Sequence, residues 1–369
     1  MKILVVFGTR PEAIKMAPVI QRLKADGRCE TRVCVTGQHR EMLDQVLHFF
    51  GIVPDYDLNL MKEGQTLSSL SAAVLLGLEP LLQAYRPDYL LVHGDTTTSA
   101  MAALAGLYAQ VKICHVEAGL RTYNLESPFP EEANRQLTGR LAWLHFAPTE
   151  SARKNLLQEN VPAERIFVTG NTVTDALAYA VAEVDKSEPV QIIPLKKKLQ
   201  PDRAIALVTC HRRENIGPGF LAICAALKAI VQQHPLQLVY PVHLNPKVRD
   251  IAYRELDGVE GIHLVAPLDY PSFIWMMKNA AFMITDSGGV QEEASALGKP
   301  IILMRDRTER PEVVSSGHVW MVGAHHDQIV AAVKELMQGG HPFSENQGSL
   351  DLGESPSDQI LSIIHAYHV

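Results

Sequence analysis

Short apolar runs alternate with longer segments of helical periodicity along most of this 369-residue chain. The runs are rich in β-branched residues and therefore predict buried strands. In the first half of the chain, strands are expected at 2–7, 31–36, 88–93, 112–116, 143–147 and 165–168, and helices at 11–25, 66–85, 96–109 and 131–142. This alternation is typical of a parallel sheet with helices on both faces.

The alternation is interrupted by a Pro- and Lys-rich stretch at 188–201, which predicts a connector or a surface helix. It then begins again, with strands expected at 203–209, 236–240, 261–265, 281–285, 300–304 and 318–322, and helices at 218–233, 270–279, 288–297 and 325–338. Residues 340–355 predict a loop, and 356–368 predict an amphipathic terminal helix. The pattern thus predicts the α/β fold class, with two doubly wound, Rossmann-like domains in series.

Composition agrees with this picture and excludes several classes of function. A length of 369 residues favours two domains, because single cores rarely grow beyond about 250–300 residues. The net charge of −7 argues against a general nucleic-acid binder. No stretch approaches the roughly 20 apolar residues of a membrane helix, and the N-terminal apolar run is too short for a signal peptide. The five scattered cysteines suggest reduced thiols in a cytoplasmic protein.

Candidate ligand contacts follow the first expected strand, since doubly wound sheets bind ligands beyond the carboxyl ends of their strands. Arg10 and Lys15 bracket the start of the next helix, after Gly8. A helix N-terminus flanked by cations favours an anion. The alternative is a plain turn with surface cations.

Three carboxylates also lie at or just beyond expected strand ends: Asp95, Glu117 and Glu131. Each has a structural alternative: Asp95 would cap the following helix, Glu117 would pair with Arg121, and Glu131 would be an ordinary acid in a first helical turn. Clustered carboxylates raise one another's pKa, which suits general acids and bases near neutral pH. Convergence of the three therefore predicts proton-transfer chemistry.

In the second half, His211 follows an expected strand. It is a candidate acid, base or hydrogen-bond donor to a phosphate, and Arg212 adds positive charge beside it. His243 is interpreted from its context as a structural loop histidine. Another expected strand runs into Ser287, Gly288 and Gly289, where glycine lets backbone N–H groups approach an anion at a helix start.

Two further side chains extend this expected anion site. Glu293, about one turn into the helix, is placed to accept hydrogen bonds from sugar hydroxyls. Arg310 would reach the same phosphates, unless its segment is simply a solvated run of charges. No spacing of metal ligands is convincing, so no metal is expected.

Taken in order, these segments resemble the non-hydrolysing UDP-N-acetylglucosamine 2-epimerases of bacterial type over residues 1 to about 338. The motifs are Gly8-Thr9-Arg10-Pro11-Glu12-Ala13, His93-Gly94-Asp95-Thr96, His115-Val116-Glu117-Ala118-Gly119-Leu120-Arg121, Pro128-Phe129-Pro130-Glu131-Glu132-Ala133-Asn134-Arg135, His211-Arg212-Arg213-Glu214-Asn215 and Asp286-Ser287-Gly288-Gly289-Val290-Gln291-Glu292-Glu293.

The resemblance implies a GT-B-like fold with the active site in the interdomain cleft. It implies domains at 1–170 and 171–354, with the terminal helix at 355–369 packing back on the first domain. It also implies a cytoplasmic homodimer that needs no cofactor and supplies N-acetylmannosamine for surface polysaccharide. The implied reaction eliminates UDP across C1–C2 to give 2-acetamidoglucal and then adds UDP back with C2 inverted.

The resemblance also assigns roles to residues. Asp95, Glu117 and Glu131 would be the carboxylates of proton transfer, in an order that is left open, and His211 would assist near the diphosphate. The implied contacts of UDP and sugar are Arg10, Lys15, Asp95, Glu117, His211, Leu268 (through its backbone), Phe273, Ser287, Gly288, Gly289, Glu293 and Arg310. A second, activating nucleotide sugar would contact Gln38, Glu131, Arg212 and His243.

Other functions stay open on the residues alone. A GT-B glycosyltransferase acting on a UDP-sugar would share the fold and the nucleotide site, but it would need an acceptor pocket and one base rather than three carboxylates. A hydrolysing epimerase would normally carry a fused kinase domain, for which this length leaves no room.

Overall fold

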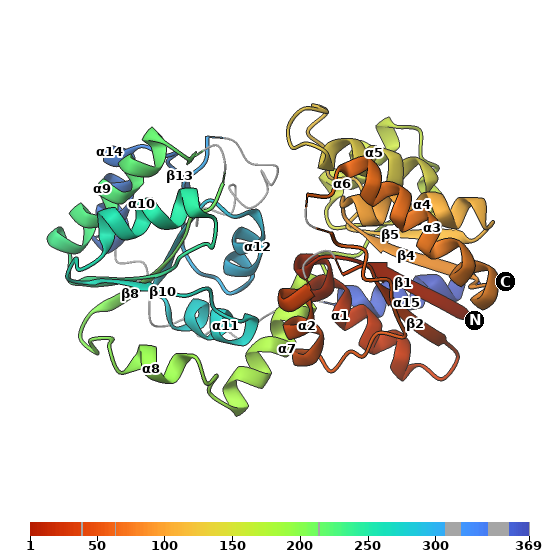
Figure 1. The fold of residues 1–369 in the computed structure, drawn as a ribbon, viewed down its shortest axis with the longest axis horizontal. Coiled ribbons are helices and arrows are strands. Elements are labelled where there is room, and N and C mark those ends of the chain that lie inside the picture. The colour runs from red at the N-terminus through yellow and green to blue at the C-terminus, as the bar shows by residue number, and fades with distance from the viewer. Residues whose placement is uncertain (38–39, 63, 213–214, 307–318, 339–353, 369) are drawn as a thin grey trace. The chain divides into compact units, whose positions relative to one another are not determined.

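The computed structural model describes residues 1–37, 40–62, 64–212, 215–306, 319–338 and 354–368. The chain forms two compact units: unit 1, which comprises Met1–Ala176 and Leu352–Val369, and unit 2, which comprises Leu177–Asp351. Both units contain helices and a parallel sheet, so the predicted α/β class is confirmed (Figure 1). The domain boundaries expected from the sequence stay a prediction.

The sheet of unit 1 has, within the described residues, seven parallel strands in the order β3-β2-β1-β4-β5-β6-β7. The strands are β1 (Lys2–Phe7), β2 (Glu30–Val35), β3 (Tyr56–Asp57), β4 (Tyr89–His93), β5 (Lys112–Val116), β6 (Leu144–Ala147) and β7 (Ile166–Val168). Five of the six residues of β1 are buried, as expected for a central strand covered on both faces. The strand order reverses between β1 and β4, the place where such sheets bind ligands.

The helices of unit 1 are α1 (Arg10–Ala25), α2 (Arg40–Phe49), α3 (Leu67–Tyr85), α4 (Thr97–Tyr108), α5 (Glu131–Leu141), α6 (Glu150–Gln158) and α15 (Pro356–Ala366). Helices α3 and α4 pack on one face of the sheet, in a core that includes Leu4 and Val6 of β1 and Leu90 and Val92 of β4. α1 contacts α2 and α15.

The C-terminal helix α15 packs against α1, at the far end of the sequence (Figure 1). Its inward side chains, Ile360 and Ile364, are fully buried. Beyond the helix, the carbonyl of Tyr367 accepts a hydrogen bond from the Tyr89 hydroxyl at 2.9 Å. The last turn of the chain is therefore part of the structure of unit 1.

The sheet of unit 2 has, in the described ranges, six parallel strands in the order β10-β9-β8-β11-β12-β13. The strands are β8 (Ala204–Thr209), β9 (Leu236–Pro241), β10 (Ile262–Val265), β11 (Phe282–Thr285), β12 (Ile301–Leu303) and β13 (Val319–Met321). The helices are α8 (Ile192–Lys196), α9 (Pro218–Gln233), α10 (Pro246–Leu256), α11 (Tyr270–Asn279), α12 (Gly288–Ala296) and α14 (His326–Gln338). Helix α7 (Val173–Lys186) crosses the boundary between the units.

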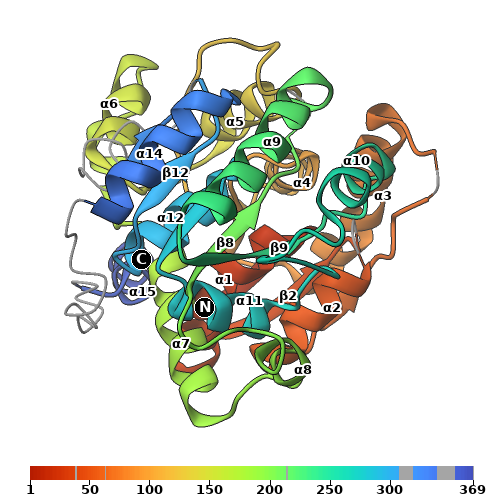
Figure 2. The same cartoon turned by 90° about the vertical axis from the view of Figure 1, so that its left-hand side faces the viewer.

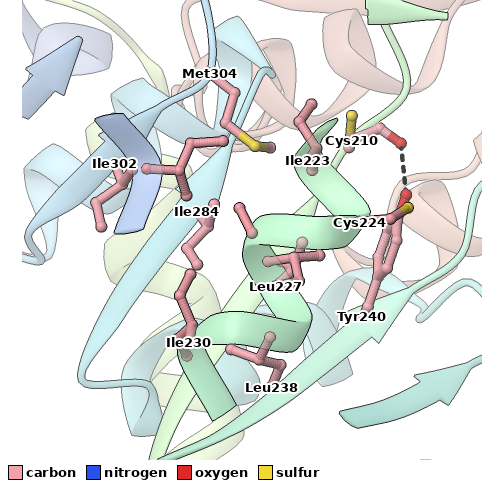
Figure 3. Packing of buried hydrophobic residues seen from close by; sticks show 14 of the residues in the cluster. Cys210, Ile223, Cys224, Leu227, Ile230, Leu238, Tyr240, Ile284, Ile302 and Met304 are labelled. Atoms are coloured by element: carbon pink, nitrogen blue, oxygen red, sulfur yellow. Dashed lines mark hydrogen bonds between the residues drawn. The ribbon is translucent and has the colours of Figure 1, made fainter. Parts of the chain in front are cut away.

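The core of unit 2 forms where α9 meets the sheet. Helices α9 and α14 lie side by side on one face (Figures 1 and 2). Ile223, Leu227 and Ile230 of α9 point at the strands, and the hydroxyl of Tyr240 donates to the carbonyl of Cys210 at 3.1 Å (Figure 3). This bond satisfies a buried phenol and fixes the chain directly after β8.

Each strand and helix expected from the periodicity has a counterpart in the structure, and several elements were missed. The helices α2, α6, α7 and α10 and the two-residue strand β3 were not predicted. The expected loop at 340–355 lies mostly outside the described residues.

The expectation about membrane helices needs correction. α3 has 19 residues with a mean hydropathy of 1.4, which is long and apolar enough by composition to cross a membrane. Only 28% of its apolar window is buried inside the structure. A single helix of this kind also occurs in the cores of soluble proteins. Six residues of α3 are buried in unit 1: Leu70, Val74, Leu78, Leu81, Leu82 and Tyr85.

Candidate active site

The first helix of unit 1 is tied to the reversal point of the sheet by a buried carboxylate. Glu12 is 2% exposed and accepts hydrogen bonds from the backbone N–H groups of Gly8 and Thr9 at 3.0 and 2.8 Å. Its other oxygen accepts from the hydroxyls of Thr96 and Ser99 at 2.7 and 2.8 Å. Glu12 therefore joins the turn after β1 to the start of α4, and it orients the groups that follow both strands.

Glu117, directly after β5, pairs with a lysine from the first helix. Its Oε2 accepts a hydrogen bond from Lys15 Nζ, and both side chains are about nine-tenths buried. Asn171 Nδ2 donates to the same oxygen at 3.3 Å, and His93 Nε2 lies 3.7 Å away.

The expected alternative, a pair between Glu117 and Arg121, is wrong, because Arg121 pairs with Glu159 at 2.6 Å.

The backbone at Glu117 is itself unusual, with φ at +61°. A side chain costs roughly 1–2 kcal/mol in this left-handed region, and such residues concentrate at functional sites. In this conformation the Glu117 carboxylate lies near the turn after β4. Its Oε1 is 3.7 Å from the position that a Cβ would occupy on Gly94.

Asp95 follows β4 but does not cap the next helix, since the cap of α4 is Thr96. Its carboxylate lies 3.2 Å from Arg135 Nε, and its side chain is 31% exposed. Burial among protein atoms raises the pKa of Asp95 to about 6. The positive charge of Arg135 lowers this pKa, whereas the carboxylates of Glu117 and Glu131 raise it. The structure therefore brings the three predicted carboxylates close enough to influence one titration.

Helix α5 supplies the supporting groups for Asp95. Asn134 Nδ2 donates to the Asp95 carbonyl at 2.9 Å, and Arg135 also approaches Glu132 at 3.8 Å. Burial acts to raise the pKa of Glu132, but the N–H of Thr122, neighbouring side chains and the Arg135 charge outweigh it and lower that pKa.

Glu131, the first residue of α5, is half-buried. Arg135, Asn171 and Glu12 were not singled out individually in the sequence.

We expect the substitution Arg135→Gln to raise the pKa of Asp95 further, because it removes the nearby cation that favours the carboxylate form. We expect kcat/KM to change with pH near 6 through the ionisation of Asp95, and this limb of the profile should move upward by about one pH unit in Arg135→Gln. The profile is measured between pH 4.5 and 9 beside Arg135→Lys, which keeps the charge and should keep the limb. If the limb in Arg135→Gln stays at the same pH or moves to a lower pH, it does not report the ionisation of Asp95.

In unit 2 the strand order reverses between β8 and β11, and one buried carboxylate joins the segments that follow these strands. Asp286 has no exposed surface and accepts from the backbone N–H groups of His211 and Arg212 at 3.1 and 2.9 Å. Asn215 Nδ2 donates to it at 3.0 Å, and the Cys210 thiol at 3.2 Å. Asp286 was only part of a motif in the sequence, yet it organises this edge of the second sheet.

Two histidines lie against each other at this edge. The rings of His211 and His243 are nearly parallel, with centroids 5.5 Å apart. His211 Nδ1 is 3.4 Å from Asp286 Oδ1. Burial lowers the pKa of His211, the Asp286 carboxylate raises it, and the net direction is downward. His243 Nδ1 accepts the N–H of Asn245 at 3.0 Å, in agreement with a structural role in its own loop.

The expected anion cradle lies at the start of α12. Ser287 is the N-cap residue and its side chain makes no capping hydrogen bond, while its N–H donates to the Thr285 hydroxyl at 2.9 Å. Gly288 and Gly289 form the first turn, and a Cβ added at Gly289 would meet no protein atom within 4 Å. Gly289 is therefore accessible to an approaching ligand, whereas Gly288 is buried.

The remaining expected contacts of unit 2 lie on neighbouring elements. Glu293 is on α12 and 7% exposed, Phe273 is half-buried on α11, and Leu268 is 9% exposed just before α11. In unit 1, Arg10 is half-buried at the first position of α1. Gln38 and Arg310 lie outside the described residues.

One group of side chains has the chemistry of metal ligands, but it lies elsewhere in unit 1. Among the described residues, donor atoms of Asp26, Cys29 and His365 lie within 4.8 Å of one another. The Asp26 carboxylate already accepts from Arg28 Nη2 at 2.7 Å and contacts His365 Nε2 at 2.6 Å. We interpret the group as the anchor of α15 rather than as a metal centre.

Comparison with known proteins finds similar sequences along the whole chain. The protein-family model described as UDP-N-acetylglucosamine 2-epimerase matches residues 21–364. The UDP-N-acetylglucosamine 2-epimerase of Salmonella typhimurium is 50% identical over 374 residues, which cover 100% of both chains.

Solved structures extend the likeness to three dimensions. The crystal structure of UDP-GlcNAc 2-epimerase from Neisseria meningitidis bound to UDP-GlcNAc is 42% identical, with a TM-score of 0.89, and the match covers 99% of this chain and 100% of that one. The glycotransferase of kitacinnamycin matches 99% of this chain and 98% of its own at 12% identity and a TM-score of 0.64, which speaks for the fold alone. Together they confirm the predicted GT-B-like fold.

Proposed function

This chain belongs to the UDP-N-acetylglucosamine 2-epimerase family, and on that premise we propose how it inverts C2 of UDP-N-acetylglucosamine to give UDP-N-acetylmannosamine. The family is one of non-hydrolysing isomerases, as the resemblance of the motifs predicted. The observation that carries the proposal is the cluster of Asp95, Glu117 and Glu131 in a chain that matches such an epimerase along its full length.

The proposed reaction proceeds by elimination and re-addition. A carboxylate removes the C2 proton, the electrons of the C–H bond form the C1–C2 double bond, and the C1–O bond breaks with its electron pair on the diphosphate oxygen. The products are 2-acetamidoglucal and UDP. A carboxylic acid then delivers a proton to the other face of C2, the electrons of the double bond form the new C–H bond, and the diphosphate oxygen bonds to C1 again.

The site of unit 1 supplies groups for both proton transfers. With a pKa of about 6, Asp95 populates its acid and its base form near neutral pH, as a reversible proton transfer requires. Glu117 is held by Lys15 and Asn171, so its oxygens are fixed in direction. We leave open which carboxylate acts on which face of C2.

The groups of unit 2 are proposed to stabilise the leaving UDP. Ser287, Gly288 and Gly289 begin α12, whose N-terminus favours the charge that develops on the diphosphate, and Gly289 has open space beside it. His211, whose backbone is fixed by Asp286, would donate to the same group, as would Arg10 and Arg310. Phe273, Leu268 and Glu293 would hold the uridine.

The elimination is tested with enzyme in excess over UDP-N-acetylglucosamine, by rapid quench and mass spectrometry. We expect UDP and 2-acetamidoglucal to appear and then to disappear as the nucleotide sugars equilibrate. As a reverse test, 2-acetamidoglucal added together with UDP should yield both nucleotide sugars. If neither route involves the glucal while epimerisation proceeds, the mechanism is wrong and the isomerase function stands.

Activation by a second nucleotide sugar is proposed at Gln38, Glu131, Arg212 and His243. The stacking of His243 on His211 supports the proposal, since it would join an activator contact to a diphosphate contact. We further propose that the protein is a homodimer in the cytoplasm and that its product supplies surface polysaccharide synthesis.

A further inference from the structure

The asparagine that contacts Glu117 also begins the helix by which the chain leaves unit 1. Asn171 lies between β7 and α7, and its Nδ2 donates to Glu117 Oε2 at 3.3 Å. Its Oδ1 accepts the backbone N–H of Val173 at 3.0 Å, and its carbonyl accepts the hydroxyl of Thr174 at 2.9 Å. One half-buried residue therefore holds both a carboxylate of the candidate site and the first turn of α7.

Helix α7 is one of the two passages of the chain between the units. Residues 173–176 of this helix belong to unit 1, and residues 177–186 belong to unit 2. An α-helix is a continuous hydrogen-bonded rod, so a change in the direction of its second part is passed to its first turn. Because Asn171 caps that turn, its amide must follow the direction of α7.

The second passage is fastened to the first within unit 1. The chain returns to this unit at Leu352 and soon enters α15. Asp175 of α7 accepts the N–H of Ser357 at 2.8 Å and the hydroxyl of Ser355, the N-cap of α15, at 3.0 Å. Gly170 has φ at +81°, and a Cβ placed on it would lie 3.2 Å from Pro356 Cγ. Both passages are thus joined beside the asparagine that contacts Glu117.

The contact with Asn171 restricts Glu117 in a way that its contact with Lys15 does not. An ammonium group is a compact point charge with three rotatable donors, so it accepts a carboxylate from many directions. The amide of Asn171 is planar, and its orientation is set by the cap that it makes on α7. Lys15 therefore supplies the charge beside Glu117, whereas Asn171 supplies the direction.

We propose that Asn171 is a positioning residue for Glu117, and that it makes the position of this carboxylate depend on the direction of α7. The inference rests on the proposed function, in which Glu117 takes part in proton transfer at C2. A misplacement of about 1 Å can cost about 100-fold in the rate of a positioned reaction. Turnover should therefore depend on the amide of Asn171, while binding of UDP should not.

The variant Asn171→Asp separates the two contacts of this side chain. Aspartate caps a helix as well as asparagine does, so α7 should keep its first turn. It places an acceptor where the donor was, and its carboxylate repels that of Glu117. We expect kcat to fall about 100-fold, with the melting temperature, the KM and the affinity for UDP close to the wild-type values. Asn279→Asp, the same change at an exposed position, is the control and should leave kcat unchanged.

A double-mutant cycle with Glu117→Gln shows whether Asn171 acts through Glu117. Turnover of the four proteins is measured by NMR of the nucleotide sugars. On the Glu117→Gln background, Asn171→Asp should lower the remaining turnover by no more than about twofold, because the carboxylate that it positions is already absent. A loss of about 100-fold on both backgrounds overturns the proposal, as does wild-type kcat in a folded Asn171→Asp protein.

A second variant, Asn171→Ser, takes the same place in the cycle if Asn171→Asp fails to fold. Serine also caps helices well, and its shorter side chain gives up the contact with Glu117. A large loss in Glu117→Gln beside wild-type turnover in the Asn171 variant overturns this inference alone. Wild-type turnover in Glu117→Gln removes Glu117 from the proposed function and overturns the inference with it.

Discussion

Replacing Asp95 with asparagine is expected to lower turnover by about two to four orders of magnitude while UDP still binds. Asparagine keeps the size of the side chain and its contact with Arg135 through the amide oxygen, but it cannot transfer a proton. The proposed UDP contacts lie mainly in unit 2, whereas Asp95 is in unit 1. Turnover is measured by NMR of the nucleotide sugars, and UDP binding by calorimetry.

Asp88 offers a matched control for this variant. Asp88 and Asp95 flank the same strand, β4, at its opposite ends, and Asp88 is exposed. The substitution Asp88→Asn should leave turnover near the wild-type value. Loss of UDP binding in Asp95→Asn together with a lowered melting temperature would mean that Asp95 is structural, and retention of more than a tenth of the turnover would remove it from proton transfer.

Replacing Asp286 with alanine is expected to destabilise the protein by about 3 kcal/mol and to abolish UDP binding. The substitution leaves the buried amide of Asn215 and the partly buried N–H groups of His211 and Arg212 without their acceptor. An unsatisfied buried donor costs about 1–3 kcal/mol, so the loops after β8 and β11 should lose their fixed geometry. Calorimetric melting and titration with UDP measure the two effects.

The control for this second variant is Asp202→Ala, an exposed carboxylate of the same unit. It should leave the melting temperature and the affinity for UDP unchanged. A stable Asp286→Ala protein that binds UDP as the wild type does would contradict the role of Asp286 as the organiser of this edge.

Much of the fold could be predicted because the central strands are buried on both faces. β1 and β4 read as unbroken apolar runs, and helices such as α9 present a clear apolar stripe. β3 was not predicted from the sequence, because two residues at a sheet edge are too few to show a pattern of burial. α2, α6 and α10 are short helices of 10, 9 and 11 residues, and each has an amphipathic sequence, so the pattern was present and was overlooked because of its length.

The site was predictable in its residue types and not in its pairings. Position after a strand was enough to select Asp95 and Glu117, because parallel strands end at one edge of the sheet. Sequence distance cannot show that Lys15 rather than Arg121 meets Glu117, since 102 residues separate Lys15 from its partner. The supporting carboxylates Glu12 and Asp286 were overlooked because each seemed an ordinary member of a helix start or a strand end.

The central claim is that this chain inverts C2 of UDP-N-acetylglucosamine with no net release of UDP. Proton NMR of the purified protein with UDP-N-acetylglucosamine in D2O tests it most directly, with neither acceptor nor metal added. We predict that the manno anomeric signal grows, that deuterium enters at C2 and that the final products are nucleotide sugars, with UDP bonded to C1. Accumulation of UDP and free N-acetylmannosamine, or a spectrum that does not change, would contradict the claim.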